Sequence, residues 1–362
     1  MGNDVDNNDN IDGVPGLAVL QPGSDTLGSG ATETFPSVSV VIPCYSMGRW
    51  DFLLRSVASV RSQIAQPAEI IVVVDHNPEL LSRVASEIPN VVAIPNAGKH
   101  GVSGGRNSGA KASRGDVVAF LDDDVVAPAD WLSGLVAHLK DPDVVGAGTY
   151  FEGNWESPRP RWFPGEFGWT LGLSYAGMPT EPTAVRNVWT SAMVVRKSAF
   201  DAVDGFREDF GKIGDRNLPE DTDLCLRITS SQDNKGLWIY DPHRIALHQV
   251  PASRATFRYF LSRCFLQGWG KAAMASMDGF GTSTSMEMDY ARRILPAGVR
   301  RGVVETLRGD VSGAQRSASI VLALSFTVAG YFWHLLTVRG GHAPSTPSGR
   351  APDRQRPGTG AP

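Results

Sequence analysis

The chain has 362 residues, of which 42% are hydrophobic and 20% charged, enough for one large α/β domain with additions or for two domains. Its formal net charge of −4 argues against a general nucleic-acid binder. The three cysteines, Cys44, Cys225 and Cys264, form no CxxC pair, which argues against a zinc knuckle or disulfide framework and favours a reducing compartment.

Both ends of the chain have the composition of disordered tails. Residues 1–36 carry six acidic residues and no basic ones, with few large apolar side chains. They show neither the basic start nor the apolar run of a secretory signal. Residues 340–362 are rich in Pro, Gly, Ser and Arg. We therefore expect the folded structure to lie between these two segments.

Short apolar runs alternate with helical spacings in the first third of the chain. We expect strands at 38–42, 69–75 and 91–94, and helices at 49–63 and 78–88. Continuous apolar strands that alternate with helices indicate a mainly parallel sheet covered on both faces. The ligand crevice of such a sheet lies at the carboxyl ends of its strands.

Three consecutive carboxylates, Asp122, Asp123 and Asp124, follow the apolar run 117–121. At the end of a buried strand they can face the ligand crevice, and Asp122 and Asp124 can address the same side of the strand. Carboxylate oxygens are the ligands that Mg²⁺ or Mn²⁺ prefers. The segment therefore indicates a site for a divalent cation, and the alternative is a solvated acidic turn or a helix N-cap before 128–131.

The segment 98–110 is rich in glycine but contains neither a P-loop nor a dinucleotide-binding fingerprint. Its glycines permit close approach of the backbone, and the Arg106 guanidinium can fork onto a phosphate or a base carbonyl. The alternative is a flexible loop in which Arg106 pairs with a surface acid.

Residues 151–186 are irregular in pattern and carry several large aromatic side chains, including Trp155, Trp162, Trp169 and Tyr175. Aromatic faces stack on sugar rings, so the segment suits a substrate-binding lobe. The other interpretation is a loop clamped by its own aromatic residues. We expect the chain to return to a strand at 187–196.

Glu220 and Asp221 stand at the start of a helix predicted over 219–228. One of two adjacent carboxylates can act as a general base toward a hydroxyl nucleophile. Acids after Pro219 also suit an ordinary helix N-terminus, which is the alternative. Two short edge strands are expected at 238–242 and 244–248, and His248 at their end is a candidate third metal ligand.

The C-terminal part is expected to be helical from 258 to 277, where Arg263 and Lys271 either hold a diphosphate or form a solvated basic face. Residues 317–338 contain no Asp, Glu, Lys or Arg and are long enough to cross a bilayer core. A membrane-dipping helix and a buried helix are the alternatives. From Ala291 onward the sequence contains ten Arg and only three acidic residues. This excess of positive charge suits binding to an anionic surface such as the cytoplasmic leaflet.

Taken in order, these segments resemble the family 2 glycosyltransferases, which have the GT-A fold. The matching pieces lie within residues 38–271, at 40–45, 73–75, 105–109, 120–124, 205–206 and 220–224. The family pattern has Asp-Asp or Asp-Gly after the second strand, whereas here Asp75 is followed by His76. The Gln-x-x-Arg-Trp motif of processive members is not evident, so the resemblance favours a non-processive enzyme. The apolar 317–338 segment looks like that of members acting on lipid-linked acceptors.

The resemblance implies a role for each matching position. Those implied to bind the donor nucleotide are Pro43, Tyr45, Asp75, Arg106, Asp122 and Asp123. Asp124, with His248, would bind the Mn²⁺ or Mg²⁺ that bridges the donor diphosphate. Asp221 would deprotonate the acceptor hydroxyl, with Glu220 beside it. The positions expected near the acceptor are Trp189, Ser191, Trp269 and Arg263.

The resulting hypothesis is an inverting, metal-dependent transferase that moves one sugar from a nucleotide-sugar, expected to be a UDP-sugar, to a hydroxyl acceptor. The expected acceptor is a polyprenyl-linked or cell-surface glycan, and one base with direct in-line attack implies inversion. The alternatives are a soluble transferase that glycosylates a small natural product and a non-catalytic nucleotide-sugar-binding module.

The expected organisation follows the same boundaries. A GT-A catalytic domain spans 37–255, with a nucleotide-binding half at 37–150 and an acceptor half at 151–255. A helical region follows at 256–339 and includes the apolar segment 317–338, which is expected to associate with a membrane. The expected location is cytoplasmic, either peripheral to the membrane or anchored at its cytoplasmic face.

Overall fold

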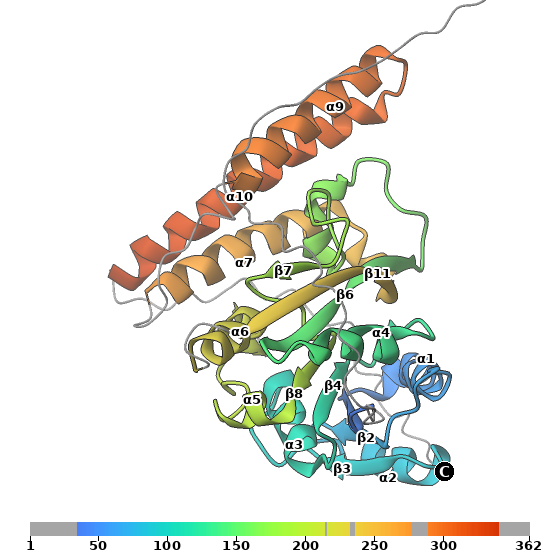
Figure 1. Ribbon diagram of the computed structural model, residues 1–362. Helices are drawn as coiled ribbons and strands as arrows, with labels where there is room; N and C mark the ends of the chain where they lie inside the picture. The colour runs from blue at the N-terminus through green and yellow to red at the C-terminus, as the bar shows by residue number, and fades with distance from the viewer. Residues whose placement is uncertain (1–34, 214–215, 232–235, 277–288, 340–362) are drawn as a thin grey trace, which may run out of the picture. The chain divides into compact units, whose positions relative to one another are not determined.

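The computed structural model describes residues 35–213, 216–231, 236–276 and 289–339 (Figure 1). Apart from Phe35 and Pro36, the two predicted tails at 1–36 and 340–362 lie outside the described residues. The predicted helix end at Met277 lies outside them as well.

A mixed sheet of nine strands forms the centre of the fold. Its order is β3-β2-β1-β4-β8-β6-β11-β5, with β7 paired to β11. Strands β3, β2, β1 and β4 run parallel, whereas β8 is antiparallel to both β4 and β6. The strands are β1 (Val38–Cys44), β2 (Glu69–Val74), β3 (Val92–Pro95), β4 (Val117–Leu121), β5 (Val125–Val126), β6 (Val144–Trp155), β7 (Thr183–Val185), β8 (Ala192–Arg196) and β11 (Leu237–Val250). A separate hairpin joins β9 (Gly211–Ile213) to β10 (Arg216–Leu218).

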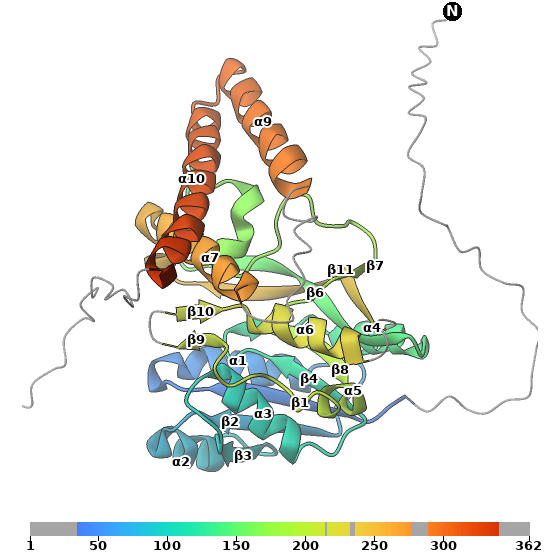
Figure 2. The ribbon, with the colours of Figure 1, turned by 90° about the vertical axis from the view of Figure 1, so that its left-hand side faces the viewer.

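Helices cover both faces of this sheet, as the sequence pattern predicts. They are α1 (Trp50–Arg61), α2 (Pro78–Glu87), α3 (Val102–Ala112), α4 (Trp131–Ala137), α5 (Lys197–Asp201) and α6 (Glu220–Ser231). Alternate side chains of β1, Val40 and Ile42, belong to a core shared with α1, α2 and α4. Val41 between them belongs to a second core with α3, α5 and α6, which lie over the strands in Figure 2. Because successive side chains of a strand point to opposite faces of the sheet, β1 contributes residues to both cores.

The glycine-rich segment forms a helix, so the alternative interpretation of a flexible loop is wrong. Glycine disfavours helices when they stand alone, yet here it lets α3 lie close to the sheet. A Cβ at Gly109 would meet the side chain of Val41 and lie 3.0 Å from Val73 Cγ2. Close packing of α3 on β1 and β2 therefore outweighs its weak intrinsic propensity.

The two predicted edge strands are one continuous strand, β11, and it is not at an edge. It pairs in parallel with β6 and antiparallel with β5 and β7. Its register against β6 shifts between Asp241 and Ile245, around Pro242. Proline has no N–H for the ladder, so a bulge at this position lets one strand continue past it.

Within the described residues, the C-terminal part contains α7 (Phe257–Ala275), a π-helical turn at Tyr290–Ile294, α9 (Leu295–Leu307) and α10 (Ser312–Arg339). Helix α10 packs along both α7 and α9. The backbones of α7 and α10 come close, because a Cβ at Gly268 would overlap the Thr327 carbonyl oxygen and one at Gly330 would overlap that of Phe265. Small residues at such a crossing permit this approach.

The aromatic stretch after β6 packs against these helices. Phe163 and Phe167 share a buried cluster with Phe260 of α7 and Ile320 of α10. The Trp169 indole Nε1 donates a hydrogen bond to the Tyr290 hydroxyl at 3.3 Å. These contacts support the interpretation of an aromatic segment clamped by packing.

Candidate active site

The three acids lie in a turn between β4 and β5. The Asp122 N–H donates to the Ser191 carbonyl at 2.9 Å, and the Val125 N–H donates to the Asp122 carbonyl at 3.1 Å. This turn follows the end of β4, where the carboxyl ends of β1 and β2 also lie. Because the chain turns here, Asp122 and Asp124 contact different partners and form two adjoining clusters.

The first cluster gathers around the buried guanidinium of Arg106, which is only 2% exposed. Its Nη2 lies 2.6 Å from Asp122 Oδ1, and its Nη1 lies 3.6 Å from Glu220 Oε1. Burial opposes the charge, but Asp122, Glu220 and Asp221 together raise the pKa of Arg106. Arg106 is therefore a buried cation among acids from two segments, the turn after β4 and the start of α6, and not a loop residue paired at the surface.

Glu220 and Asp221 open helix α6 and reach toward this cation. Asp221 Oδ1 accepts hydrogen bonds from the Thr190 N–H, at 3.3 Å, and from the Thr190 hydroxyl. Burial, reinforced by the neighbouring Asp221, raises the pKa of Glu220 to about 7. Burial also raises the pKa of Asp221 against the opposing charge of Arg106. A carboxylate pair that holds a proton near neutral pH is suited to general-base chemistry.

The second cluster joins Asp123 and Asp124 to Arg49, the last residue of the 3₁₀ turn Met47–Arg49. Arg49 Nη2 lies 2.6 Å from Asp123 Oδ1 and 2.5 Å from Asp124 Oδ2. His248 Nε2 lies 3.5 Å from Asp124 Oδ1, so β11 contributes to the cluster next to β5.

The two carboxyl groups of this cluster differ in their ionisation. Burial, reinforced by Asp124 and Asp122, raises the pKa of Asp123 to about 7. Burial acts on Asp124 in the same direction, but His248, Arg49 and Arg254 hold its pKa well below the usual range. Asp124 is therefore the carboxylate that stays charged.

The residues of this cluster fit a divalent cation. Carboxylate oxygens and a neutral imidazole are ligands that Mn²⁺ accepts. Asp123 Oδ2 and His248 Nδ1 are buried polar atoms without a hydrogen-bond partner among the described residues. Two carboxylate oxygens already converge on one positively charged nitrogen, which identifies a point where positive charge is stabilised.

Asp75, at the end of β2, forms a third polar group. Its carboxylate accepts hydrogen bonds from Asn96 Nδ2 at 2.6 Å and from the Gly101 N–H at 3.0 Å. His76 Nδ1 lies 2.8 Å away, and the ring of His76 stacks on that of His100 with centroids 3.8 Å apart. His76, the residue that departs from the family pattern, thus stacks on His100 and places a pair of imidazoles beside Asp75.

The remaining predicted residues are more scattered. Pro43 is buried at the end of β1, whereas the Tyr45 side chain is 57% exposed. Trp189 packs edge-on against Phe151, with centroids 5.6 Å apart. Ser191 accepts from the Asp122 N–H through its backbone carbonyl.

The two α7 residues predicted near the acceptor are not joined to the acids. Trp269 packs edge-on against His334 of α10, with centroids 5.0 Å apart. Arg263 has a buried Nε without a hydrogen-bond partner in the described chain. Among the described residues, neither side chain forms a hydrogen bond or ion pair with the carboxylates of the two clusters.

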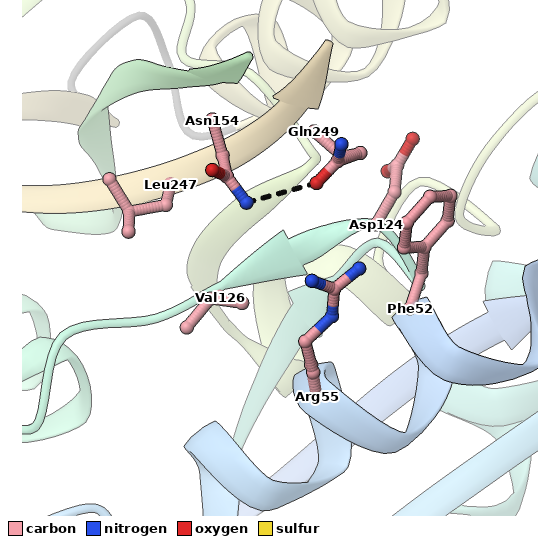
Figure 3. Close-up of a pocket in the computed structure, with 7 residues that line it drawn as sticks. All are labelled: Phe52, Arg55, Asp124, Val126, Asn154, Leu247 and Gln249. Carbon is pink, nitrogen blue, oxygen red and sulfur yellow. Dashed lines mark hydrogen bonds between the residues drawn. The ribbon is translucent and has the colours of Figure 1, made fainter. Parts of the chain in front are cut away.

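A pocket lined by both polar and apolar side chains opens beside Asp124 (Figure 3). Asn154 Nδ2 donates to Gln249 Oε1 at 3.0 Å, and the Gln249 N–H donates to the Asp124 carbonyl at 3.0 Å. The Arg55 guanidinium extends from α1 toward this amide pair. The pocket is small and partly open to solvent, and it is lined by Phe52, Arg55, Asp124, Val126, Asn154, Leu247 and Gln249.

Sequence reasoning missed Arg49 and Thr190, which contact the predicted carboxylates most closely. Arg49 follows Ser-Met-Gly and matches no motif, and Thr190 lies between Trp189 and Ser191 in a stretch predicted only as a strand. Arg49 is 74 residues from Asp123 in the sequence, and Thr190 is 31 residues from Asp221. No local spacing pattern could therefore have indicated these contacts.

Comparison with known proteins identifies this arrangement. The family model described as glycosyl transferase family 2 matches residues 39–204. A glucosyl-dolichyl phosphate glucuronosyltransferase from Haloferax volcanii is 33% identical over 242 residues, which cover 66% of this chain and 77% of that protein. A pre-mycofactocin glycosyltransferase from Mycobacterium tuberculosis is 30% identical over 176 residues, 48% of this chain and 35% of that protein. A solved mannosyltransferase from Pyrobaculum calidifontis superposes with a TM-score of 0.54 at 16% identity, covering 83% of this chain and 88% of that one.

The architecture is therefore that of a GT-A glycosyltransferase, an enzyme that transfers sugars from nucleotide-sugar donors. The chain belongs to glycosyl transferase family 2. The predicted fold class, family and enzyme class are thereby confirmed.

Proposed function

We propose that the protein is an inverting, metal-dependent glycosyltransferase that moves one sugar from a UDP-sugar to a hydroxyl of a lipid-linked acceptor. The observation that carries this proposal is the cluster of Asp122, Glu220 and Asp221 around Arg106, next to the pair Asp123–Asp124. It supports a site where a diphosphate and a reacting hydroxyl lie side by side.

In this proposal Asp221 takes the proton of the acceptor hydroxyl as that oxygen attacks the anomeric carbon. The hydrogen bonds from Thr190 hold its carboxylate in one orientation, and Glu220 beside it keeps the pair's affinity for a proton high. Asp122 binds the ribose or base side of the donor and is positioned by Arg106. A single base with in-line attack leads to inversion.

Asp124 and His248 are the proposed holders of Mn²⁺ or Mg²⁺. When bound, the cation neutralises the negative charge that develops on the departing nucleoside diphosphate. Pro43, Tyr45, Asp75 and Asp123 complete the proposed donor pocket, with Asp75 toward the nucleobase.

The proposed organisation assigns donor binding to residues 37–150 and acceptor binding to 151–255. The positions Trp189 and Ser191 support the acceptor assignment better than Trp269 and Arg263, because Ser191 contacts the backbone of Asp122. The region 256–339 serves membrane association.

The proposal of a lipid-linked acceptor rests on helix α10 and on the similarity to the glucosyl-dolichyl phosphate enzyme. Residues Ser312–Thr337 form a helix long and apolar enough to cross a membrane, and only 22% of its most apolar 18-residue stretch is buried. Phe332 is 57% exposed and Leu336 is 69% exposed. A core helix of a soluble enzyme would bury such residues, so this exposure disfavours a soluble transferase acting on a small natural product.

The membrane assignment can be tested with charges on the exposed face of α10. We expect F326E/F332E to reduce the fraction bound to phosphatidylglycerol vesicles by roughly tenfold or more, since a carboxylate is costly in the hydrocarbon region. Flotation of the full-length protein measures this fraction. The matched control places the same charges at exposed positions near the start of α10, A314E/Q315E, and should bind like the wild type. Equal recovery of F326E/F332E would rule out insertion of this helix.

The catalytic proposal is tested by a donor panel. Full-length protein is incubated with Mn²⁺, UDP- or GDP-sugars including UDP-glucuronate, and a glucosylated polyprenyl phosphate. We expect one UDP-sugar to be consumed, the product linkage to be inverted by NMR, and EDTA to abolish turnover. Retained anomeric configuration or turnover unaffected by EDTA would contradict the mechanism. Binding without transfer across the panel would favour a non-catalytic module instead.

A further inference from the structure

Arg49 makes the closest contacts of any cation in the second cluster. One nitrogen, Nη2, lies 2.6 Å from Asp123 Oδ1 and 2.5 Å from Asp124 Oδ2. The arginine side chain is 18% exposed, and the two aspartates are 5% and 8% exposed. Two neighbouring carboxylates with so little access to water repel each other, and the guanidinium offsets that repulsion.

The position of Arg49 makes it a competitor of a divalent cation. Asp124 is the proposed ligand, and its Oδ2 already binds the guanidinium. A cation held by this carboxylate would lie close to the Arg49 guanidinium in a site with little access to water, where like charges repel strongly. Both charges cannot be accommodated there without movement of one, and the side chain is the mobile partner.

The arginine has a route out of the cluster toward the proposed donor pocket. It ends the 3₁₀ turn that follows β1, and its guanidinium carbon lies 5.4 Å from the centre of the Tyr45 ring. Tyr45 is 57% exposed, so this side of Arg49 borders solvent. Its Nε is buried and has no hydrogen-bond partner among the described residues, which leaves a donor unsatisfied in the paired state.

We propose that Arg49 occupies the cation site of the donor-free enzyme and, when a divalent cation binds, swings out to contact the donor diphosphate. The inference rests on the proposed function: its first half uses the assignment of the cation to Asp124, and its second half also uses the assigned donor. In this proposal Arg49 is a positioning residue that couples metal binding to nucleotide binding. Its guanidinium gives up its contacts with two carboxylates and forms a contact with the donor diphosphate.

The test measures binding of Mn²⁺ alone, by the loss of the free-ion EPR signal, in the full-length protein. We expect R49Q to bind Mn²⁺ about tenfold more tightly than the wild type, because the competing charge-assisted contacts are gone. A merely structural role for Arg49 would leave the affinity unchanged or weaken it, and either result overturns the proposal. R49K, which keeps the charge, should remain close to the wild type.

Two further variants locate the effect. Arg55 lines the Asp124 pocket, but its Nε donates a hydrogen bond to the Asp51 carbonyl. The Mn²⁺ affinity of R55Q should therefore match that of the wild type. R49Q/D124N should lose the gain seen in R49Q, and retention of that gain would place the cation elsewhere and overturn the proposal.

The second half is measured by calorimetric titration of UDP at saturating Mn²⁺. We expect R49Q to bind UDP about tenfold more weakly than the wild type, since one charge-assisted contact to the diphosphate is lost. Equal affinities would overturn the contact to the diphosphate. If the wild type itself fails to bind UDP, the proposed donor is wrong, and the Mn²⁺ measurement still decides whether Arg49 competes with the cation.

Discussion

Replacing Asp221 by Asn is expected to lower kcat by roughly 10²–10⁴-fold, because an amide cannot accept the proton of the acceptor hydroxyl. The substitution keeps the size of the side chain and an oxygen for the hydrogen bonds from Thr190. Donor binding should therefore change little, and the defect should appear in kcat under saturating donor and acceptor. Initial-rate kinetics of the purified variant measure both quantities.

Glu220→Gln is the matched control for this experiment. Glu220 lies one residue earlier on the same helix, but it faces Arg106 and receives no bond from Thr190 among the described contacts. We expect its loss of kcat to be at least about tenfold smaller than that of D221N. The reverse order would assign the base to Glu220, and full activity in D221N would remove Asp221 from the mechanism.

The pH profile gives an independent reading of the same pair. Burial, reinforced by its carboxylate neighbour, raises the pKa of Glu220 to about 7, and the pKa of Asp221 is raised as well. A base works only when deprotonated, so wild-type kcat should rise with pH over about one unit on either side of 7 and level off above that range. In D221N this limb should disappear. A profile that is flat across this range in the wild type would contradict a base in the Glu220–Asp221 pair.

Asp124→Asn is expected to reduce kcat/KM by roughly 10²-fold or more, the loss of several kcal/mol of charge stabilisation by the cation. Asp124 is the carboxylate of its cluster that stays ionised, because His248, Arg49 and Arg254 overcome the effect of burial and hold its pKa low. An amide oxygen in its place binds Mn²⁺ weakly. Activity measured against Mn²⁺ concentration should show the requirement shifted upward or lost.

Asp123→Asn provides the comparison at the adjacent position. Burial, with Asp124 and Asp122, raises the pKa of Asp123 to about 7, so its side chain carries less charge at neutral pH. We expect a loss of less than about tenfold and a nearly unchanged Mn²⁺ requirement. Should D123N be the more damaging variant, the cation would belong to Asp123 instead of Asp124.

Much of the sheet followed from local patterns. The strands β1, β2 and β4 and the helices α1 and α2 lie within two residues of their predicted positions, because their apolar periods are strong and short-ranged. Helix α3 was missed as a helix because its glycines carry low propensity, which only contact with β1 and β2 offsets. The continuous strand β11 was split at Pro242, a residue that ordinarily ends strands and here sits in a bulge.

The amino-acid sequence alone determined the alternation of strands and helices, the acids at the ends of β2 and β4, and the apolar character of α10. These properties depend on residues a few positions apart, and their order was sufficient to indicate the family. Only the tertiary structure decided which charges meet. Asp123 meets Arg49 from the turn after β1, and Asp124 meets His248 from β11. Asp221 meets Thr190, which lies just before β8. Such pairings depend on how the chain returns to the sheet, and no local period records them.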